Sequence, residues 1–406
     1  MPSTRIAVSS VLGFSVAGLM LVAMGSGPGP RPGDPLPGLN QGELARFNAG
    51  RAAFEEEEFA ADGLGPVFTE NACAKCHSTP AVGGGSTIVE MRIGRRVAGV
   101  FDPLVEFGGP IIQNQGIGQG TGYNGPYDFA GEVIPPQATV RAGRRSTPLF
   151  GLGLVEAVPD ETFWRMAELQ RLLSPETAGR PHVVRDLATG EPAVGRFGWK
   201  AQLSTLFDFA GDAYANEMGI TTPLVPHENA PQGSTEALLK NPLPYLLPDG
   251  TEVPNEPDNE DLVLFSDFMR FLAPPPRGGE TRQVRSGAVV FASIGCASCH
   301  LPALRTGPSP VRALSHITFH PFSDFLLHDM GSLGDGIEQG DATGREMRTA
   351  PLWGVSVQTS YLHDGRAATL EEAILAHDGQ ARASRIRFSR LNAARKRALI
   401  AFLNSL

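Results

Sequence analysis

The sequence predicts a mainly α-helical protein of two related domains, with long loop insertions in the first. Two observations support this prediction: a five-residue cysteine and histidine motif occurs twice, and the segments around the two copies resemble each other. The third is composition, because 48 glycines and 34 prolines make up about a fifth of the 406 residues, against about 12 % in an average protein. We therefore expect short regular elements joined by many loops.

The N-terminal segment is predicted to be an export signal. Residues 6–24 form an uncharged, mostly apolar run preceded by Arg5, and Ala23 and Gly25 supply the small residues of a cleavage site. An uncleaved anchor is the alternative, since a helix over this run would be roughly 28 Å long, just enough to span a bilayer. We predict a signal peptide over residues 1–25 and a flexible Pro/Gly segment over 26–44.

All four cysteines belong to two C-x-x-C-H motifs. They are Cys73 and Cys76 followed by His77, and Cys296 and Cys299 followed by His300. This is the attachment signature of a c-type haem: thiols three residues apart share a helical turn and can reach both vinyl groups of one porphyrin, and the next imidazole can bind the iron. A disulfide, a thioredoxin-like motif and a shared zinc site are the alternatives, and the zinc site would leave both histidines unexplained. We predict two covalently bound c-type haems with His77 and His300 as proximal iron ligands.

The surroundings of the two motifs repeat. Residues 50–54 resemble 287–291 before the motifs, and 145–151 resemble 348–354 after them. Repetition of a whole unit indicates domains of common origin, here two cytochrome c-like haem domains. The Pro-rich stretch 273–279 resembles a stiff linker. We predict the first haem domain over 45–273 and the second over 280–406.

The first domain carries additional elements between its repeated segments. Helices are expected over residues 162–173 and 261–272. The Gly-rich stretch 108–131 is expected to be irregular, and 221–258 to be a long surface excursion. The acidic run that opens the insertion 55–68 is expected to be a solvated face.

The charge balance excludes some partners. The chain has 34 basic and 43 acidic side chains and a net charge of −9, which argues against nucleic-acid binding because phosphate neutralisation needs an excess of Lys and Arg. The sign is uneven: seven basic and no acidic residues follow Asp378, so without them the charge of −9 would be −16.

The C-terminal motifs resemble those of bacterial di-haem cytochrome c peroxidases and of the related di-haem oxidoreductases. The segments that carry the likeness are 348–354, 361–365 and 369–374, with further matches at 196–200, 218–221 and 327–331. The likeness covers roughly residues 45–406. It implies a periplasmic enzyme with two covalent haems and electron transfer between them.

The segment after residue 368 contains a candidate distal ligand for the second haem. Thr369 and Glu372 form a T-x-x-E capping box, and Leu370, Ile374 and His377 share one face of the helix that follows. In the peroxidases that the chain resembles, a residue at the position of His377 supplies the distal ligand, usually as methionine. The resemblance therefore implies iron ligation by His377, and a core histidine is the alternative. Two imidazoles would give a lower potential than imidazole with thioether.

Other side chains near the second motif have weaker claims. His363 and His328 are expected to order loops or contact a propionate, and Met330 is an outside candidate for an axial ligand. Trp164, Trp199 and Trp353 are expected to be packing residues, and Trp353, in the repeated element, is the best alternative candidate for an electron relay between the haems.

The first haem lacks an obvious distal ligand. His182 and His227 lie among prolines and polar residues, so both are expected at the surface, which would leave the iron open to a small oxidant. Peroxide chemistry also needs an acid/base, and the resemblance implies Glu156 for this catalytic role; a surface carboxylate is the alternative. Arg144 or Arg145 can pair with a propionate.

These features together predict a periplasmic di-haem oxidoreductase, a peroxidase or peroxide-using oxidase that reacts at the first haem and receives electrons through the second. A non-catalytic electron-transfer cytochrome and a haem oxygenase-type oxidation of an organic substrate are the alternatives. The partners would be a peroxide or small oxidant and a small redox protein or quinol-linked electron donor, with membrane contact only if the N-terminal segment stays uncleaved. The resemblance also allows a calcium ion, for which the sequence offers no ligand set.

Overall fold

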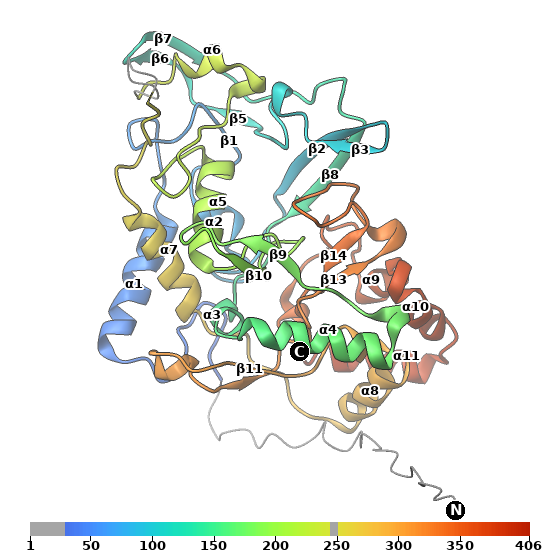
Figure 1. Cartoon of the computed structure of the whole chain (residues 1–406). Coiled ribbons are helices and arrows are strands. Elements are labelled where there is room, and N and C mark those ends of the chain that lie inside the picture. The colour runs from blue at the N-terminus through green and yellow to red at the C-terminus, as the bar shows by residue number, and fades with distance from the viewer. Residues whose placement is uncertain (1–28, 244–250) are drawn as a thin grey trace, which may run out of the picture.

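The computed structural model describes residues 29–243 and 251–406 (Figure 1). In this part of the chain, eleven α-helices and fourteen short strands alternate with loops. The helices are α1 (Gln41–Glu55), α2 (Cys73–Cys76), α3 (Leu152–Glu156), α4 (Asp160–Leu173), α5 (Leu206–Met218), α6 (Thr235–Leu238), α7 (Glu260–Phe271), α8 (Arg282–Ser293), α9 (Leu370–Ala376), α10 (Arg382–Ser389) and α11 (Ala393–Leu403). The fold therefore contains helices and many strands, and "mainly α" describes it only in part.

The strands pair in small antiparallel sheets. They are β1 (Val67–Phe68), β2 (Val89–Val97), β3 (Val100–Asp102), β4 (Ile111–Ile112), β5 (Gln115–Gly116), β6 (Gly118–Gly122), β7 (Gly125–Phe129), β8 (Val140–Arg145), β9 (His182–Arg185), β10 (Pro192–Gly195), β11 (Leu304–Arg305), β12 (Thr318–Phe319), β13 (Leu327–Asp329) and β14 (Glu346–Arg348). The largest sheet is built around β2, which pairs with β3, β4 and β8. Its strands β2 and β8 carry Arg92 and Arg144 into the interior. Both side chains line a cavity beside the first cysteine and histidine motif.

The repeated sequence segments have the same structural role. Helix α1 packs against α7, and α8 packs against α11. Each pair crosses at a glycine: a Cβ on Gly50 would lie 2.1 Å from the Leu264 carbonyl oxygen, and one on Gly287 would lie 2.0 Å from that of Ala398. Any larger residue would push the helices apart, so both copies of the repeat need glycine for the same close crossing.

Two hydrophobic clusters form most of the core. One contains buried residues from 36 to 353, among them Phe268 and Trp353, and the other contains residues 284 to 406, among them Phe291 and Phe402. The first cluster thus takes in side chains from beyond the 273–279 linker. The domain boundary at this linker stays a prediction.

The long insertions are partly regular. The expected helices are present as α4 and α7. The stretch 108–131, expected to be irregular, instead contains a hairpin in which Gly122 pairs with Gly125 across a two-residue loop. The positive φ of Gly125 (104°) makes this tight turn accessible. Among the described residues no helix is long and apolar enough to cross a membrane, and the predicted signal segment lies outside them.

Candidate haem sites

The second C-x-x-C-H motif forms a turn directly after α8. Cys296 begins a short 3₁₀ turn, and the His300 imidazole that follows is held through Nδ1 by the Phe322 carbonyl oxygen at 2.9 Å. Because a carbonyl only accepts hydrogen bonds, Nδ1 carries the proton and Nε2 keeps its lone pair. The ring is thus presented as a ligand through Nε2.

His377 is presented in the same way within the cavity that His300 lines. The capping box of Thr369 and Glu372 begins α9 as the sequence predicts, and His377 follows the last helical residue. Its Nδ1 donates to the Ala373 carbonyl oxygen at 2.7 Å, which again leaves Nε2 free. Both imidazoles line one cavity of about 240 Å³.

The separation of the two rings matches a metal between them. Their centroids are 6.5 Å apart. Two imidazoles on opposite sides of one metal ion place their centroids roughly 6–6.5 Å apart, since each metal–nitrogen bond is about 2 Å and the centroid lies about 1.1 Å beyond. The pair therefore fits a haem iron. Burial lowers the pKa of His300 to about 4 and also lowers the pKa of His377, which keeps both rings in the neutral form that binds metals.

The first motif has the same local design. Cys73 and Cys76 lie on the single turn of α2, and Nδ1 of His77 donates to the Gly84 carbonyl oxygen at 3.1 Å. Burial lowers the pKa of His77 to about 4. A phenylalanine of the repeated segment lies beside each imidazole. The ring centroids of Phe54 and His77 are 6.0 Å apart, and those of Phe291 and His300 are 6.4 Å apart.

Two smaller cavities, of about 40 and 60 Å³, border His77. The smaller is mainly apolar and includes Phe54, Tyr214 and Met218. The larger has a more polar lining than the smaller, with Arg92 and Arg144 in it, and we call it the polar cavity. Among the described residues that line the two cavities, His77 is the sole histidine, so no second imidazole faces it.

A carboxylate that the sequence analysis did not identify, that of Glu217, lies at the first site. Glu217 on α5 lines both cavities, and Glu90, Arg92 and Asp212 line the polar one. Burial, reinforced by Glu90, raises the pKa of Glu217 to about 8. Arg92 lies 2.5 Å from Glu90, and neither of the contacting atoms has a well-aligned hydrogen bond. The site therefore combines a group that can exchange a proton near neutral pH with a buried cation.

Glu156 does not line any of the three cavities. One of its carboxylate oxygens accepts from the backbone N–H of Leu206 at 2.8 Å, and the other accepts from Arg270 Nε at 2.7 Å. It thus ties α3 to the start of α5 and to α7. This placement favours a structural role for Glu156 over the catalytic one that the resemblance implied, because its carboxylate contacts Leu206 and Arg270, whereas Leu152 at the start of α3 lines the large cavity.

Trp199 lies between the two sites. It lines both the large cavity of the second motif and the polar cavity of the first, as does Arg145. The indole Nε1 donates to the Arg145 carbonyl oxygen at 2.8 Å, and the ring packs edge-on against His363 at 6.2 Å. Trp353, the sequence-based candidate for the relay, instead packs in the core against Phe319 and borders only the large cavity.

The two arginines proposed for a propionate have different surroundings. Arg145 lines both cavities and donates to the Ser360 hydroxyl at 2.8 Å. Arg144 is instead paired with Asp335 at 2.6 Å, in a buried cluster that includes Lys200. Arg145 is therefore the better placed of the two.

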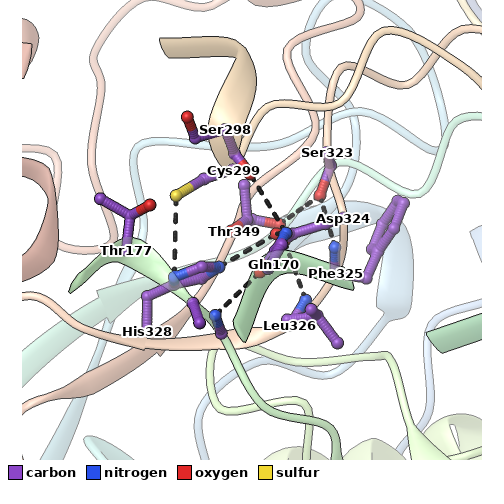
Figure 2. Close-up of polar contacts among 12 residues, drawn as sticks. Gln170, Thr177, Ser298, Cys299, Ser323, Asp324, Phe325, Leu326, His328 and Thr349 are labelled. Atoms are coloured by element: carbon purple, nitrogen blue, oxygen red, sulfur yellow. Dashed lines mark hydrogen bonds and ion pairs between the residues drawn. The ribbon is translucent and has the colours of Figure 1, made fainter. Parts of the chain in front are cut away.

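His328 is tied into a buried network beside Cys299 (Figure 2). Its Nε2 lies 3.0 Å from Asp324 and its Nδ1 lies 3.6 Å from the Cys299 sulfur, while Gln170 of α4 donates to Asp324 at 2.7 Å. Among the described residues, Cys299, Asp324 and His328 are the one close group of metal-ligating side chains. Its sulfur and nitrogen atoms do not suit calcium, which takes oxygen ligands, and the sequence motif predicts that this sulfur binds a haem. The network therefore orders the turn of the second motif.

The two remaining first-domain histidines do not line any of the three cavities. His227 is exposed as expected and contacts Glu252. His182 is buried, contrary to the surface placement expected, because β9 carries it inward and its Nδ1 donates to the Lys200 carbonyl oxygen at 2.8 Å. His363 and Met330 do line the large cavity.

Two half-buried cysteine and histidine turns, each presenting an imidazole with a free Nε2, define the class as a di-haem protein. The chain belongs to the family described as "Di-haem oxidoreductase, putative peroxidase", whose model matches residues 135–406, about two thirds of the chain. It is therefore an oxidoreductase enzyme with two haems. The match includes the second motif, whereas the first motif lies before it.

Solved structures give weaker likenesses. Hydrazine synthase of Kuenenia stuttgartiensis is 14 % identical, with 95 % of this chain and 99 % of that chain covered and a TM-score of 0.37. A MauG-like protein associated with microbial copper homeostasis is 16 % identical, with 95 % of each chain covered and a TM-score of 0.39. The diheme peroxidase BthA of Burkholderia thailandensis is 15 % identical, with 74 % and 94 % covered and a TM-score of 0.29. Likenesses this weak support no conclusion about the site. No curated protein matches the chain.

Proposed function

We propose that the protein is an exported di-haem peroxidase that reduces hydrogen peroxide at the first haem with electrons supplied through the second. The observation that carries the proposal is the difference between the two sites. His300 faces His377 at a separation suited to two axial ligands, whereas His77 faces no second imidazole in its cavities and lies beside Glu217 and Arg92.

In this proposal each haem is bound covalently by its cysteine pair. Cys73, Cys76 and His77 hold the first, and Cys296, Cys299 and His300 hold the second, with His377 as its distal ligand. A haem with two imidazole ligands supplies a low-potential, six-coordinate electron-transfer centre, and one with an open position supplies a site for peroxide.

The residues around the first site supply proton transfer and charge stabilisation. Glu217 accepts a proton from one peroxide oxygen and donates it to the other, so that the oxygen–oxygen bond breaks with water as the leaving product. Arg92 stabilises the negative charge that develops on the departing oxygen. Two further protons and two electrons complete the reduction of one peroxide to two waters.

Trp199 is the proposed path for the electrons. It borders the cavities of both sites, and its indole N–H is held by the Arg145 carbonyl oxygen, so its ring is fixed between them. Arg145 borders the same two cavities and is proposed to bind a propionate. A periplasmic location is supported by the apolar N-terminal run and by the C-x-x-C-H motifs of the sequence.

Two measurements test the proposal. Mass spectrometry of exported protein should give the mass of the chain without residues 1–25 plus two covalent haems; retention of the intact N-terminus in membranes would favour the anchor. The oxidised protein should show one high-spin and one low-spin haem and should oxidise a reduced dye when peroxide is added. Two low-spin haems without peroxide turnover would instead favour a pure electron-transfer cytochrome, and peroxide-independent oxidation of an organic substrate would favour an oxygenase.

A further inference from the structure

One face of the molecule is strongly basic although the protein as a whole is acidic. Three helices, α8, α10 and α11, contain no acidic residue and contribute exposed arginines to it. We call this set the basic face; it consists of Arg282, Arg285, Arg382, Arg387, Arg390 (just after α10), Arg395 and Arg397. Without these seven charges the net charge of −9 would be −16.

The three helices lie together at the lower right of Figure 1. Helix α11 packs along α8, and the Gln283 side chain at the start of α8 reaches the Arg397 carbonyl oxygen at 3.4 Å. At the other end of α8, Arg387 of α10 donates to the Ile294 carbonyl oxygen at 3.3 Å. The arginines therefore lie on three neighbouring helices, with α8 in contact with both of the others.

The positive charges of this face are not neutralised within the protein. Arg385 pairs with Asp378 and Lys396 pairs with Glu371, but among the described residues none of the seven arginines of the basic face forms an ion pair with a carboxylate. Exposed apolar side chains lie among them: Val289 follows Arg285 on the same side of α8, and Ile386 precedes Arg390 by one turn of α10. Uncompensated charges around a few apolar contacts are features of a protein-binding surface.

The basic face adjoins the second haem site. Gly295 and two residues of α10, Ser384 and Arg385, line the large cavity that His300 and His377 share. Helix α10 is therefore a wall of this cavity on one side and part of the basic face on the other. A molecule docked there would lie beside the second haem and not beside the first.

We propose that the basic face is the docking surface for a small acidic electron-transfer protein. The inference rests on the proposed function, which requires electrons to enter at the second haem. Each docked donor loses one electron, so two donors, two protons and one hydrogen peroxide give two oxidised donors and two waters. The strong negative charge of the remaining surface repels an acidic partner, which steers it to the basic face.

The test uses the holoprotein and two probes of similar size, an acidic and a basic single-haem cytochrome c. Calorimetric titration at low salt should show binding of the acidic probe, weakening as salt rises because exposed charges are screened. The triple variant Arg382→Glu, Arg390→Glu, Arg397→Glu should weaken it by about tenfold or more. The matched control is the triple variant Arg51→Glu, Arg141→Glu, Lys240→Glu, whose sites lie in α1, in β8 and after α6. It changes the net charge by the same amount but lies away from the basic face, so it should weaken binding of the acidic probe far less.

Several results would overturn the docking proposal. These are equal weakening in the matched variant, preferential binding of the basic cytochrome, no salt-dependent binding of the acidic one, or binding of the basic face to vesicles of anionic lipid in its place. Binding is read by heat, and peroxide reduction is read separately with a small-molecule reductant. Absence of docking in the wild type, with intact peroxide turnover, therefore refutes this inference alone. Absence of peroxide turnover in the wild type refutes the proposed function.

Discussion

Replacing Glu217 by glutamine should lower peroxide turnover by 10²- to 10⁴-fold or so, the typical contribution of general acid–base catalysis. Glutamine keeps the shape of the side chain, which lines both cavities beside His77, but cannot exchange a proton. The loss corresponds to about 2.7–5.4 kcal/mol in the activation free energy. Stopped-flow measurement of the reaction with peroxide, at equal haem content, reads this loss directly.

The pH profile gives a second readout of the same group. Burial raises the pKa of Glu217 to about 8, and the deprotonated form is the one that accepts a proton from peroxide. Wild-type turnover should therefore rise with pH through this pKa, and the glutamine variant should lose that dependence.

Glu156→Gln is the matched control. The side chain lies outside the cavities and stabilises the junction of α5 and α7 through Leu206 and Arg270. This variant should keep its turnover and lose up to about 1.5 kcal/mol of stability, because a neutral acceptor replaces a charged one. The reverse outcome, with turnover lost in Glu156→Gln and kept in Glu217→Gln, would refute the reasoning and restore the catalytic role that the family resemblance implies.

Three further predictions concern the second site and the contact between the two halves. In His377→Ala one haem should change from low spin to high spin, whereas His377→Met should keep it low spin and raise its potential; an unchanged spectrum in the alanine variant would exclude ligation. Trp199→Phe should retain both haems but slow electron transfer between them, as followed by rapid-mixing spectroscopy after reduction of the second haem; an unchanged rate would exclude the relay. Asp335→Asn should lower the free energy of unfolding in denaturant by about 3–5 kcal/mol, because Arg144 and Lys200 would remain buried without their shared carboxylate; a loss below about 1 kcal/mol, the level of a surface ion pair, would contradict it.

Acid should act on this same cluster. The pKa of Asp335 is lowered below its ordinary value, despite burial, by Arg144 and Lys200. A carboxyl group with a depressed folded-state pKa stabilises the protein above its unfolded-state pKa, and this contribution disappears as the pH falls through the folded-state value. The stability difference between wild type and Asp335→Asn should therefore shrink in acid.

Features that depend on local geometry could be predicted from the sequence. The spacing of Cys73, Cys76 and His77 is set by one helical turn, and so is that of the second motif. The T-x-x-E capping box before α9 is equally local, and the structure contains it. The repeated Gly50 and Gly287 could be matched in the sequence because both copies of the unit need a residue without a side chain at the same helix crossing.

Long-range packing, which no local pattern reveals, brings distant side chains together at the sites. Glu217 and Arg92 lie far apart in the sequence and come together because α5 and β2 border the same cavity, and no short motif marks either of them. The sequence predicts only a packing role for Trp199, because its position between the two sites depends on how a loop folds. The resemblance implies a catalytic role for Glu156, but sequence position does not fix the direction of a side chain, and α3 turns this carboxylate toward Arg270. Local motifs fix how a haem is held, whereas long-range packing fixes which groups surround it.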